Sequence, residues 1–342
     1  MKCLVTGNHG YIGFVLSDEL LKNGHEVVGY DCDYFPLESF GRPDVFKSKE
    51  KITQIRKDIR DVSKEDMTGV DAVIHLAALP NDPACDINPK FADQINHVAT
   101  VNLAKTAKSA GVKTFIFGSS CSVFGAKGDE MINEKDKPAP ITPYGVSKQN
   151  AEQELLKLNS GSFTVACMRN ATCYGVSPRM RFDMVLNNLV GYAYTEGKVK
   201  ILSDGTSWRP IVHIEDVSRA YLLALDADKD KISGQIFAVG TENFQVKAIA
   251  SIVESTVPKS KTEYSPNGQK DLRSYRVSFD KLKETLGFKP KWSAKDGAKE
   301  LYNAYKSYGL TKESFQDSKF WAGKYFKYLI ESKSVDENLK IA

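Results

Sequence analysis

The sequence of 342 residues predicts an α/β fold: a doubly wound parallel sheet with a smaller, discontinuous α/β second domain. Two observations predict it. Short apolar runs typical of strands alternate with helical patterns through the first half of the chain, and a glycine-rich turn follows the first run. Strands that alternate with helices at this spacing lie parallel, because each helix provides the crossover. Ligands of such sheets bind beyond the carboxyl ends of the strands.

The expected elements follow in order along the chain. Strands are predicted at residues 3–6, 25–30, 72–76, 114–118 and 164–169, and helices at residues 12–21, 92–110 and 144–158. After Arg169 a helix is expected at 183–196 and a strand at 200–202, residues 211–225 and 235–239 suggest a return to the sheet, and helices dominate from Val246 onward. We therefore predict a first domain from residues 1–170 plus 207–241, and a second from residues 171–206 plus 242–342, packed over the strand ends.

Composition narrows the class of protein. Hydrophobic residues make up 42% and charged residues 26%, which is typical of a globular chain. The net charge of +4 includes no basic block among aromatics, so no nucleic-acid partner is expected. Six cysteines show neither a C-x-x-C pair nor metal-ligand spacing with histidine, which favours a reducing compartment without disulfides or a bound metal. The chain enters its first strand at once, and no apolar run reaches the ~18 residues of a membrane span, so a cytoplasmic protein without membrane contact is expected.

Three glycines after the first strand predict a dinucleotide-binding turn. Gly7, Gly10 and Gly13 have the spacing that permits a tight turn, close approach of the backbone to phosphate, and close packing of the helix on the strand. The helix that begins beside Tyr11 and Ile12 offers free N–H groups to a pyrophosphate. Taken alone, such a triplet is also found at purely structural turns.

Asp31 indicates which dinucleotide binds. It ends the second strand, where a carboxylate can accept hydrogen bonds from both adenosine ribose hydroxyls. A 2′-phosphate there would face an anion with no basic residue nearby, so NAD is predicted rather than NADP. Asp58 and Ile59 follow the next apolar stretch and are candidate contacts of the adenine, although Asp58 could equally be a surface charge.

Tyr144 and Lys148 form the candidate reaction centre. They are four residues apart, which puts a phenol and an ammonium on one helix face. We expect this ammonium, with the positive nicotinamide of an oxidised cofactor, to lower the tyrosine pKa from about 10 toward neutrality. Such a phenol can take a proton from a sugar hydroxyl while hydride leaves the carbon. Ser120, close behind the strand at 114–118, can hydrogen-bond the same alcohol; a surface pair and a serine-rich turn are the structural alternatives.

Together these motifs resemble the extended short-chain dehydrogenase/reductases, in particular the nucleotide-sugar epimerases and dehydratases, over nearly the whole chain. The resemblance rests on residues 6–13, Asp31, 58–61, 75–78, Asn96, 119–125, Tyr144 with Lys148, and 208–216. It implies a Rossmann-type NAD-binding first domain and a second domain that binds a nucleoside-diphosphate sugar. It also implies homodimers that associate through the helices at 92–110 and 144–158.

The resemblance further implies roles for single residues. Ser120, Tyr144 and Lys148 would be catalytic, with Lys148 also binding the nicotinamide ribose. Ala77 and Ala78 would line the cofactor, and Asn96 would belong to the helix that supports Lys148.

Departures from the family's patterns narrow the activity. The family's 4,6-dehydratases carry an Asp-Glu pair where this chain has Cys121 and Ser122, so a 4,6-dehydratase is not expected. Cys121 is interpreted as a packing residue, because the acid/base thiols of related 3,5-epimerases align better with Ser122. Where galactose-type 4-epimerases usually carry Asn, this chain has Thr172. The candidate substrate contacts are Ser122, Thr172, Arg181, Arg209, Asp271 and Arg273; Arg209 would contact the pyrophosphate, and a surface charge is the alternative for each arginine.

The predicted function is NAD-dependent C4 epimerisation of a nucleotide sugar through a transient 4-keto sugar. The stretch at 174–183 resembles a branch that acts on sugars of surface polysaccharides. A one-way C4 dehydrogenase or 4-keto reductase is the alternative, and a catalytically silent dinucleotide-binding regulator is the non-enzymatic one. Residues 311–342 run past the usual end of the fold, and their aromatic residues predict packing onto the body of the protein or a dimer contact.

Overall fold

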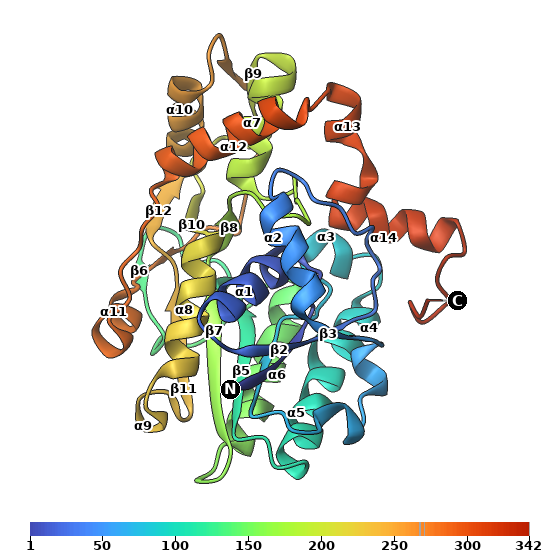
Figure 1. The fold of residues 1–342 in the computed structure, drawn as a ribbon. Coiled ribbons are helices and arrows are strands. Elements are labelled where there is room, and N and C mark those ends of the chain that lie inside the picture. Colours follow the sequence, from blue (N-terminus) through green and yellow to red (C-terminus); the bar gives the residue numbers. More distant parts are fainter. Residues whose placement is uncertain (267, 270, 342) are drawn as a thin grey trace.

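A parallel sheet forms the centre of the computed structural model, which describes residues 1–266, 268, 269 and 271–341. Across these residues the sheet has seven strands in the order β11-β7-β5-β4-β1-β2-β3 (Figure 1). The strands are β1 (Lys2–Thr6), β2 (Glu26–Asp31), β3 (Thr53–Arg56), β4 (Ala72–His75), β5 (Thr114–Ser120), β7 (Thr164–Asn170) and β11 (Gln235–Val239). The strand order reverses between β1 and β4, and this switch point is where doubly wound sheets bind ligands.

Helices cover both faces of this sheet because alternate strand residues point to opposite sides. Val5 and Ile74 belong to the core shared with α1 (Tyr11–Lys22) and α8 (Ile214–Asp226), which pack on each other. Leu4 and Val73 belong to the core shared with α5 (Thr100–Ser109) and α6 (Pro143–Leu158). The predicted doubly wound fold is confirmed.

The segment predicted as one helix at 92–110 is interrupted. It consists of α4 (Pro89–Ala92), a π-helical stretch (Asp93–Ala99) and α5. π-Helical turns are rare and frequently accompany functional sites. Here the stretch carries the buried Asn96.

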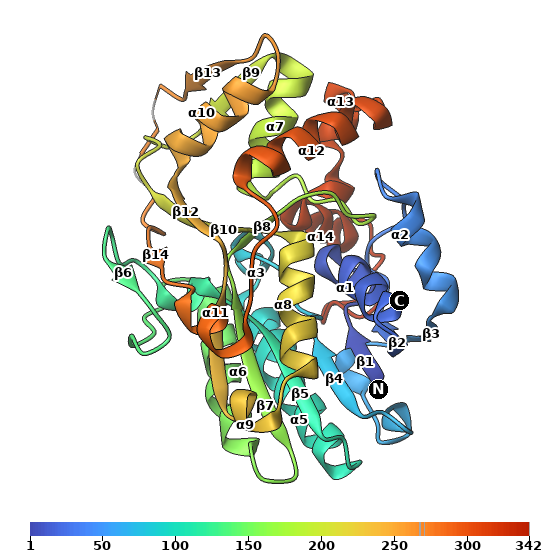
Figure 2. The ribbon, with the colours of Figure 1, turned by 60° about the vertical axis from the view of Figure 1, so that its left-hand side comes forward.

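The second half builds a group of elements beyond the carboxyl ends of the sheet (Figures 1 and 2). A three-stranded sheet pairs β8 (Thr172–Tyr174), β10 (Trp208–His213) and β12 (Glu242–Gln245). A two-stranded sheet pairs β9 (Lys198–Ile201) with β13 (Lys261–Tyr264), and another pairs β6 (Met131–Ile132) with β14 (Arg276–Val277). The main helices of this group are α7 (Val185–Glu196), α10 (Val246–Thr256) and α12 (Ala294–Tyr308).

Shorter elements complete the chain. They are α2 (Pro43–Lys47), α3 (Asp82–Cys85), α9 (Lys229–Ile232), α11 (Asp280–Leu286), α13 (Lys312–Gln316) and α14 (Ala322–Glu331), with 3-10 turns at Ser48–Lys51, Ile59–Asp61, Glu65–Met67, Cys121–Phe124 and Ser318–Phe320. None of the helices in the described part of the chain is long and apolar enough to cross a membrane.

Two expectations about strands need correction. Residues 211–225 do not return to the central sheet: β10 pairs with β8 and β12, and α8 follows directly. The helix starts there because the ring of His213 caps the amide of Glu215, and Glu215 and Asp216 supply acidic side chains to its first turn. The edge strand β3 was not predicted, since its sequence TQIR is polar and mostly exposed. The proposed division into two domains stays a prediction.

Candidate active site

A cavity of about 930 Å³ opens at the carboxyl ends of β1, β2, β4, β5 and β7. Every predicted site residue except Asn96 lines it. On the cofactor side these are Gly7, Gly10, Tyr11, Ile12, Gly13, Asp31, Asp58, Ile59, Ala77 and Ala78. The others are Ser120, Ser122, Tyr144, Lys148, Thr172, Arg181, Arg209, Asp271 and Arg273.

The turn between β1 and α1 is too tight for side chains at its glycines. A Cβ at Gly13 would lie 2.0 Å from the carbonyl oxygen of Gly7, and one at Gly7, where φ is +69°, would lie 2.8 Å from the amide nitrogen of Ala77. No side chain caps the N-terminus of α1, within the described residues, so its first amides face the cavity without a side-chain acceptor. This arrangement fits a pyrophosphate.

Asp31 is fixed at the end of β2 by backbone donors. The amides of His9 and Asp33 donate to its two carboxylate oxygens at 3.1 and 2.9 Å. Burial raises the pKa of this carboxyl, and these two N–H groups act in the opposite direction. The carboxylate therefore fits the hydroxyls of a ribose, which are donors.

The Asp58 carboxylate is already paired with a neighbouring arginine. The Arg60 guanidinium binds its two oxygens at 2.9 and 2.6 Å. Burial by itself raises the pKa of the Asp58 carboxyl, but the hydrogen bonds and charge of Arg60 outweigh it, so the pKa lies below its usual value. Ile59 lies beside Asp58 in the cavity wall.

Ser120, Tyr144 and Lys148 meet where β5 ends and α6 begins. The Ser120 hydroxyl donates to that of Ser122 at 3.1 Å, and its effect on the neighbouring Tyr144 is to lower the pKa of the phenol, against burial, which raises it more. Lys148 donates to the Gly118 carbonyl at 2.8 Å, and its Nζ lies 5.9 Å from the centre of the Tyr144 ring. Pro143 and the side chain of Thr142, which caps Gly145, start α6 so that Tyr144 falls in its first turn.

The expectation that Lys148 and an oxidised nicotinamide together lower the Tyr144 pKa stays a prediction. In the protein alone, burial raises the pKa of Tyr144 above its ordinary value, and burial lowers that of Lys148 to about 8. The Lys148 ammonium lies 5.9 Å from the centre of the Tyr144 ring and is bonded to the Gly118 carbonyl.

Asn96 does not line the cavity. Its side-chain amide accepts from the Leu79 amide at 2.8 Å and donates to the Leu79 carbonyl at 3.1 Å. It also donates to the Ser147 hydroxyl at 3.3 Å. Asn96 thus ties the loop after β4 to the helix that carries Tyr144 and Lys148.

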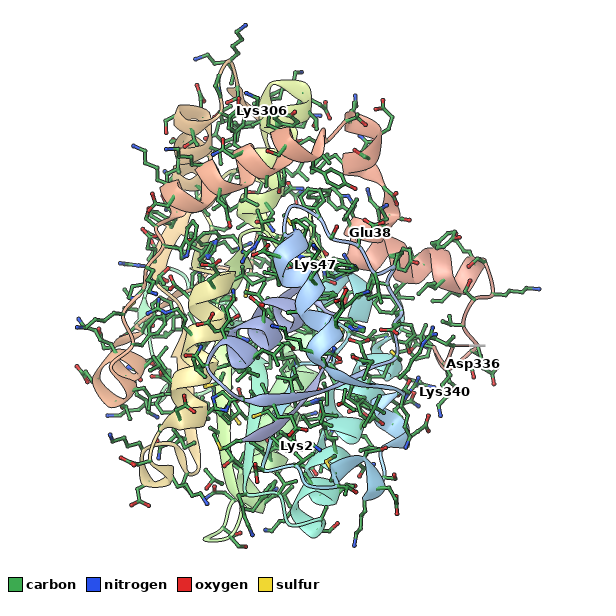
Figure 3. The ribbon with its side chains drawn as sticks, in the orientation of Figure 1. Lys2, Glu38, Lys47, Lys306, Asp336 and Lys340 are labelled. Carbon is green, nitrogen blue, oxygen red and sulfur yellow. The ribbon has the colours of Figure 1, made fainter. Side chains whose placement is uncertain are left out.

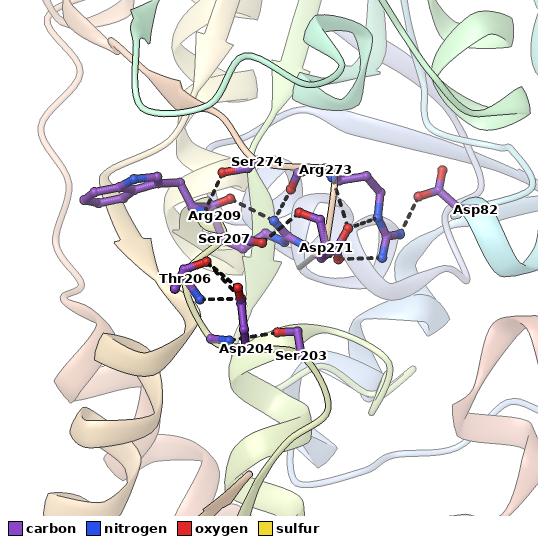
Figure 4. A network of polar contacts seen from close by, with 11 residues as sticks. Asp82, Ser203, Asp204, Thr206, Ser207, Arg209, Asp271, Arg273 and Ser274 are labelled. Atoms are coloured by element: carbon purple, nitrogen blue, oxygen red, sulfur yellow. Dashed lines mark hydrogen bonds and ion pairs between the residues drawn. The ribbon is translucent and has the colours of Figure 1, made fainter. Parts of the chain in front are cut away.

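On the opposite side, arginines are already paired with carboxylates. Arg181 is bound by Asp183 at 2.9 and 3.0 Å. Figure 4 shows Asp271 between the guanidinium groups of Arg209 and Arg273, and Arg273 reaches Asp82 at 2.7 Å. Burial lowers the pKa of Arg209, and the charge of Asp271 acts in the opposite direction. An anionic ligand would have to exchange with these carboxylates.

Several residues of the cavity wall were not predicted: Asp82, Asp183, Tyr275, Ala322 and Phe326. Asp82 follows the strand β4, so the rule that strand ends carry functional side chains could have found it. Phe326 gave no such signal, because an aromatic residue on a helix is as easily core. Cys121 is buried, and its thiol contacts the Arg169 carbonyl at 3.2 Å, which agrees with a packing role.

The cavity at the switch point, the glycine turn and the Ser-Tyr-Lys group define a dinucleotide-dependent α/β enzyme. The chain belongs to the NAD dependent epimerase/dehydratase family, whose model matches residues 3–240. NAD is its cofactor.

This chain matches named relatives over most of its length. It is similar to the UDP-glucuronate 4-epimerase of Thermodesulfobacterium geofontis (28% identity, 88% of this chain and 94% of that one). It is also similar to the UDP-glucose 4-epimerase of Mycolicibacterium smegmatis (29% identity, 87% and 96%). Among solved structures, UDP-glucuronic acid 4-epimerase from Bacillus cereus, in complex with UDP-glucuronic acid and NAD, has a TM-score of 0.79 at 28% identity, with 90% and 99% covered.

Proposed function

We propose that the protein inverts C4 of a nucleoside-diphosphate sugar, with NAD held in the site from one turnover to the next. The observation that carries this proposal is the position of the Ser120, Tyr144 and Lys148 side chains in the same cavity as the uncapped N-terminus of α1. The candidate proton acceptor and the candidate dinucleotide site therefore line the same cavity. The relatives that act on C4 of UDP-sugars support the same assignment.

The residues of this chain divide the chemistry between them. NAD supplies a hydride acceptor that later returns the hydride to the sugar. Tyr144 takes the proton of the 4-hydroxyl and returns it, and Ser120 hydrogen-bonds the same oxygen. Lys148 contributes positive charge, and because burial opposes the phenolate, the charge of an oxidised nicotinamide is needed in addition. The 4-keto sugar turns in the cavity and is reduced from its other face.

The far side of the cavity suits the diphosphate of the substrate. Arg209 and Arg273 would exchange Asp271 for phosphate oxygens, which guanidinium groups bind in the same forked geometry. Ser122 and Thr172 lie near the sugar end, and Arg181 faces the same space. The relatives suggest UDP-glucose or UDP-glucuronate as the first substrates to try.

Further parts of the proposal concern the setting of the enzyme. We place it in the cytoplasm, as a homodimer that serves polysaccharide biosynthesis, with a NAD-binding domain (1–170 plus 207–241) and a substrate domain (171–206 plus 242–342). A C4 dehydrogenase or 4-keto reductase would use the same three residues but exchange its cofactor at each turnover. A silent regulator is disfavoured, because the chain keeps both Tyr144 and Lys148.

The test begins with the freshly purified protein. Denaturation should release about one NAD per chain, identified by mass and absorbance. The intact protein should convert UDP-glucose or UDP-glucuronate to its C4 epimer without added NAD. Tyr144→Phe should keep the bound NAD and lose ~10²–10⁴-fold in turnover. NADH accumulation with a nucleotide sugar would instead indicate the dehydrogenase, and full activity of Tyr144→Phe would refute the assignment.

A further inference from the structure

The C-terminal extension, residues 311–341, lies beside the cofactor side of the cavity. Its helix α14 packs on α3, which follows β4 (Figure 1). The packing is close, because a Cβ at Gly323 would lie 2.8 Å from the Cβ of Pro83. At its start, the amide of Ala322 donates to Asp183, the partner of Arg181. The extension therefore touches elements from both halves of the chain.

Two of its side chains form part of the cavity wall. Ala322 and Phe326 line the cavity, and Phe326 is only 2% exposed. The Phe326 ring meets Tyr34 and Phe35 edge-on, at 5.4 Å between ring centres in each case. Both partners line the cavity and come soon after Asp31, whose carboxylate fits the adenosine ribose. Phe326 therefore closes the adenosine side of the cavity.

The end of the extension contacts the same region through hydrogen bonds and an ion pair. The Leu339 carbonyl accepts from the Tyr34 hydroxyl and from Arg60, the residue that orients Asp58. Lys340 pairs with Asp61 at 2.7 Å, and nearer the start Lys319 pairs with Glu38 at 2.7 Å. Figure 3 labels Lys340 and Glu38. The buried Phe326 ring and the part-buried contacts of the Leu339 carbonyl make local opening of the wall costly.

The Bacillus cereus epimerase is covered over 99% of its length, whereas 90% of this chain is covered. The uncovered tenth is about the length of the extension.

We propose that the C-terminal extension is part of the cofactor-binding site, and that Phe326 with residues 338–340 slows the dissociation of NAD by closing the adenosine side. This inference rests on the proposed function, because an epimerase that regenerates its cofactor gains from retaining it, whereas a dehydrogenase must exchange it. Contacts that close over a bound ligand change its affinity mainly through its dissociation rate, so the effect on NAD should be measured there.

The experiment compares NAD dissociation in the parent, two substituted forms and one truncated form. Phe326→Ala should release bound NAD at least ten-fold faster than the parent after transfer to buffer in which all free NAD is isotopically labelled, and added NAD should restore turnover. Tyr328→Ala is the matched control, because Tyr328 is on the same helix but 51% exposed, and it should behave as the parent. A chain that ends at Ser332 removes the Leu339 and Lys340 contacts and should also release NAD faster; it carries the test if Phe326→Ala does not fold.

The outcomes separate this inference from the proposed function. If the parent holds NAD and epimerises, but neither variant releases NAD faster, the role of the extension is refuted and the function stands. If the parent purifies without NAD and does not bind it, the proposed function fails first.

Discussion

Lys148 is a buried cation whose place in the site lowers the stability of the protein. Burial lowers its pKa from 10.5 to about 8. Between these pH values the unfolded chain binds one more proton than the folded chain, so stability rises with pH across that window. At pH 7 the cost of keeping Lys148 charged is up to about 3 kcal/mol.

This cost predicts that replacing Lys148 raises the stability of the protein and removes its activity. Lys148→Met should stabilise the NAD-free protein by about 1–3 kcal/mol at pH 7, since the lost hydrogen bond to Gly118 offsets only part of the gain. It should also remove much of the rise in stability between pH 8 and 10.5, and abolish turnover. Urea unfolding at pH 7 and at pH 9.5, roughly the middle of the window, measures both effects.

The exposed Lys105 provides the control for Lys148. Lys105→Met should leave stability and turnover nearly unchanged, because a surface substitution of this kind costs within ±0.5 kcal/mol. A Lys148→Met protein that is less stable than the parent at both pH values would show that the ammonium contributes more through its hydrogen bond than it loses by burial.

At the scale of elements, the turn from β1 to α1 requires glycine, because neighbouring backbone atoms leave no space for a Cβ at Gly13. Gly13→Ala should destabilise the protein by at least about 2 kcal/mol, because its Cβ would lie 2.0 Å from the Gly7 carbonyl, and backbone cannot move aside cheaply. It should also abolish NAD binding, since the start of α1 shifts. Thermal unfolding with and without NAD measures both losses.

Gly161→Ala is the matched control for that turn, since no described heavy atom lies within 4 Å of a Cβ placed there. It should unfold at the parent's temperature and bind NAD normally. If Gly13→Ala did the same, the turn would be more compliant than its geometry indicates.

The elements also show what sequence reasoning could reach. The glycine turn, Asp31 and the start of α6 were predictable because their chemistry is local: each is a strand end or helix start with a characteristic residue. β10 and the π-helical stretch were not, because a strand's partners and one extra residue in a helix depend on tertiary packing. The pairing of Asp271 with Arg209, and Phe326 in the wall, likewise arise from residues far apart in sequence.

At the scale of the whole molecule, the helices that position the site are also those expected at a dimer contact. Asn96 joins the loop after β4 to α6 by hydrogen bonds within one chain, so this support of Tyr144 and Lys148 needs no second copy. We therefore expect dimerisation to be separable from catalysis.

Val98 allows that separation to be measured. It lies on the π-helical stretch beside α6, and its side chain is 44% exposed, so it is accessible to a second copy at the expected contact. Val98→Arg should convert the proposed dimer to a monomer in light scattering, because a charge buried in an apolar contact has no partner there. Met131→Arg, at a 49% exposed residue on β6, should leave the dimer intact. Because the hydrogen bonds that support the site lie within one chain, monomeric Val98→Arg should still carry NAD. Loss of NAD on dissociation would mean that the dimer contact supports the site.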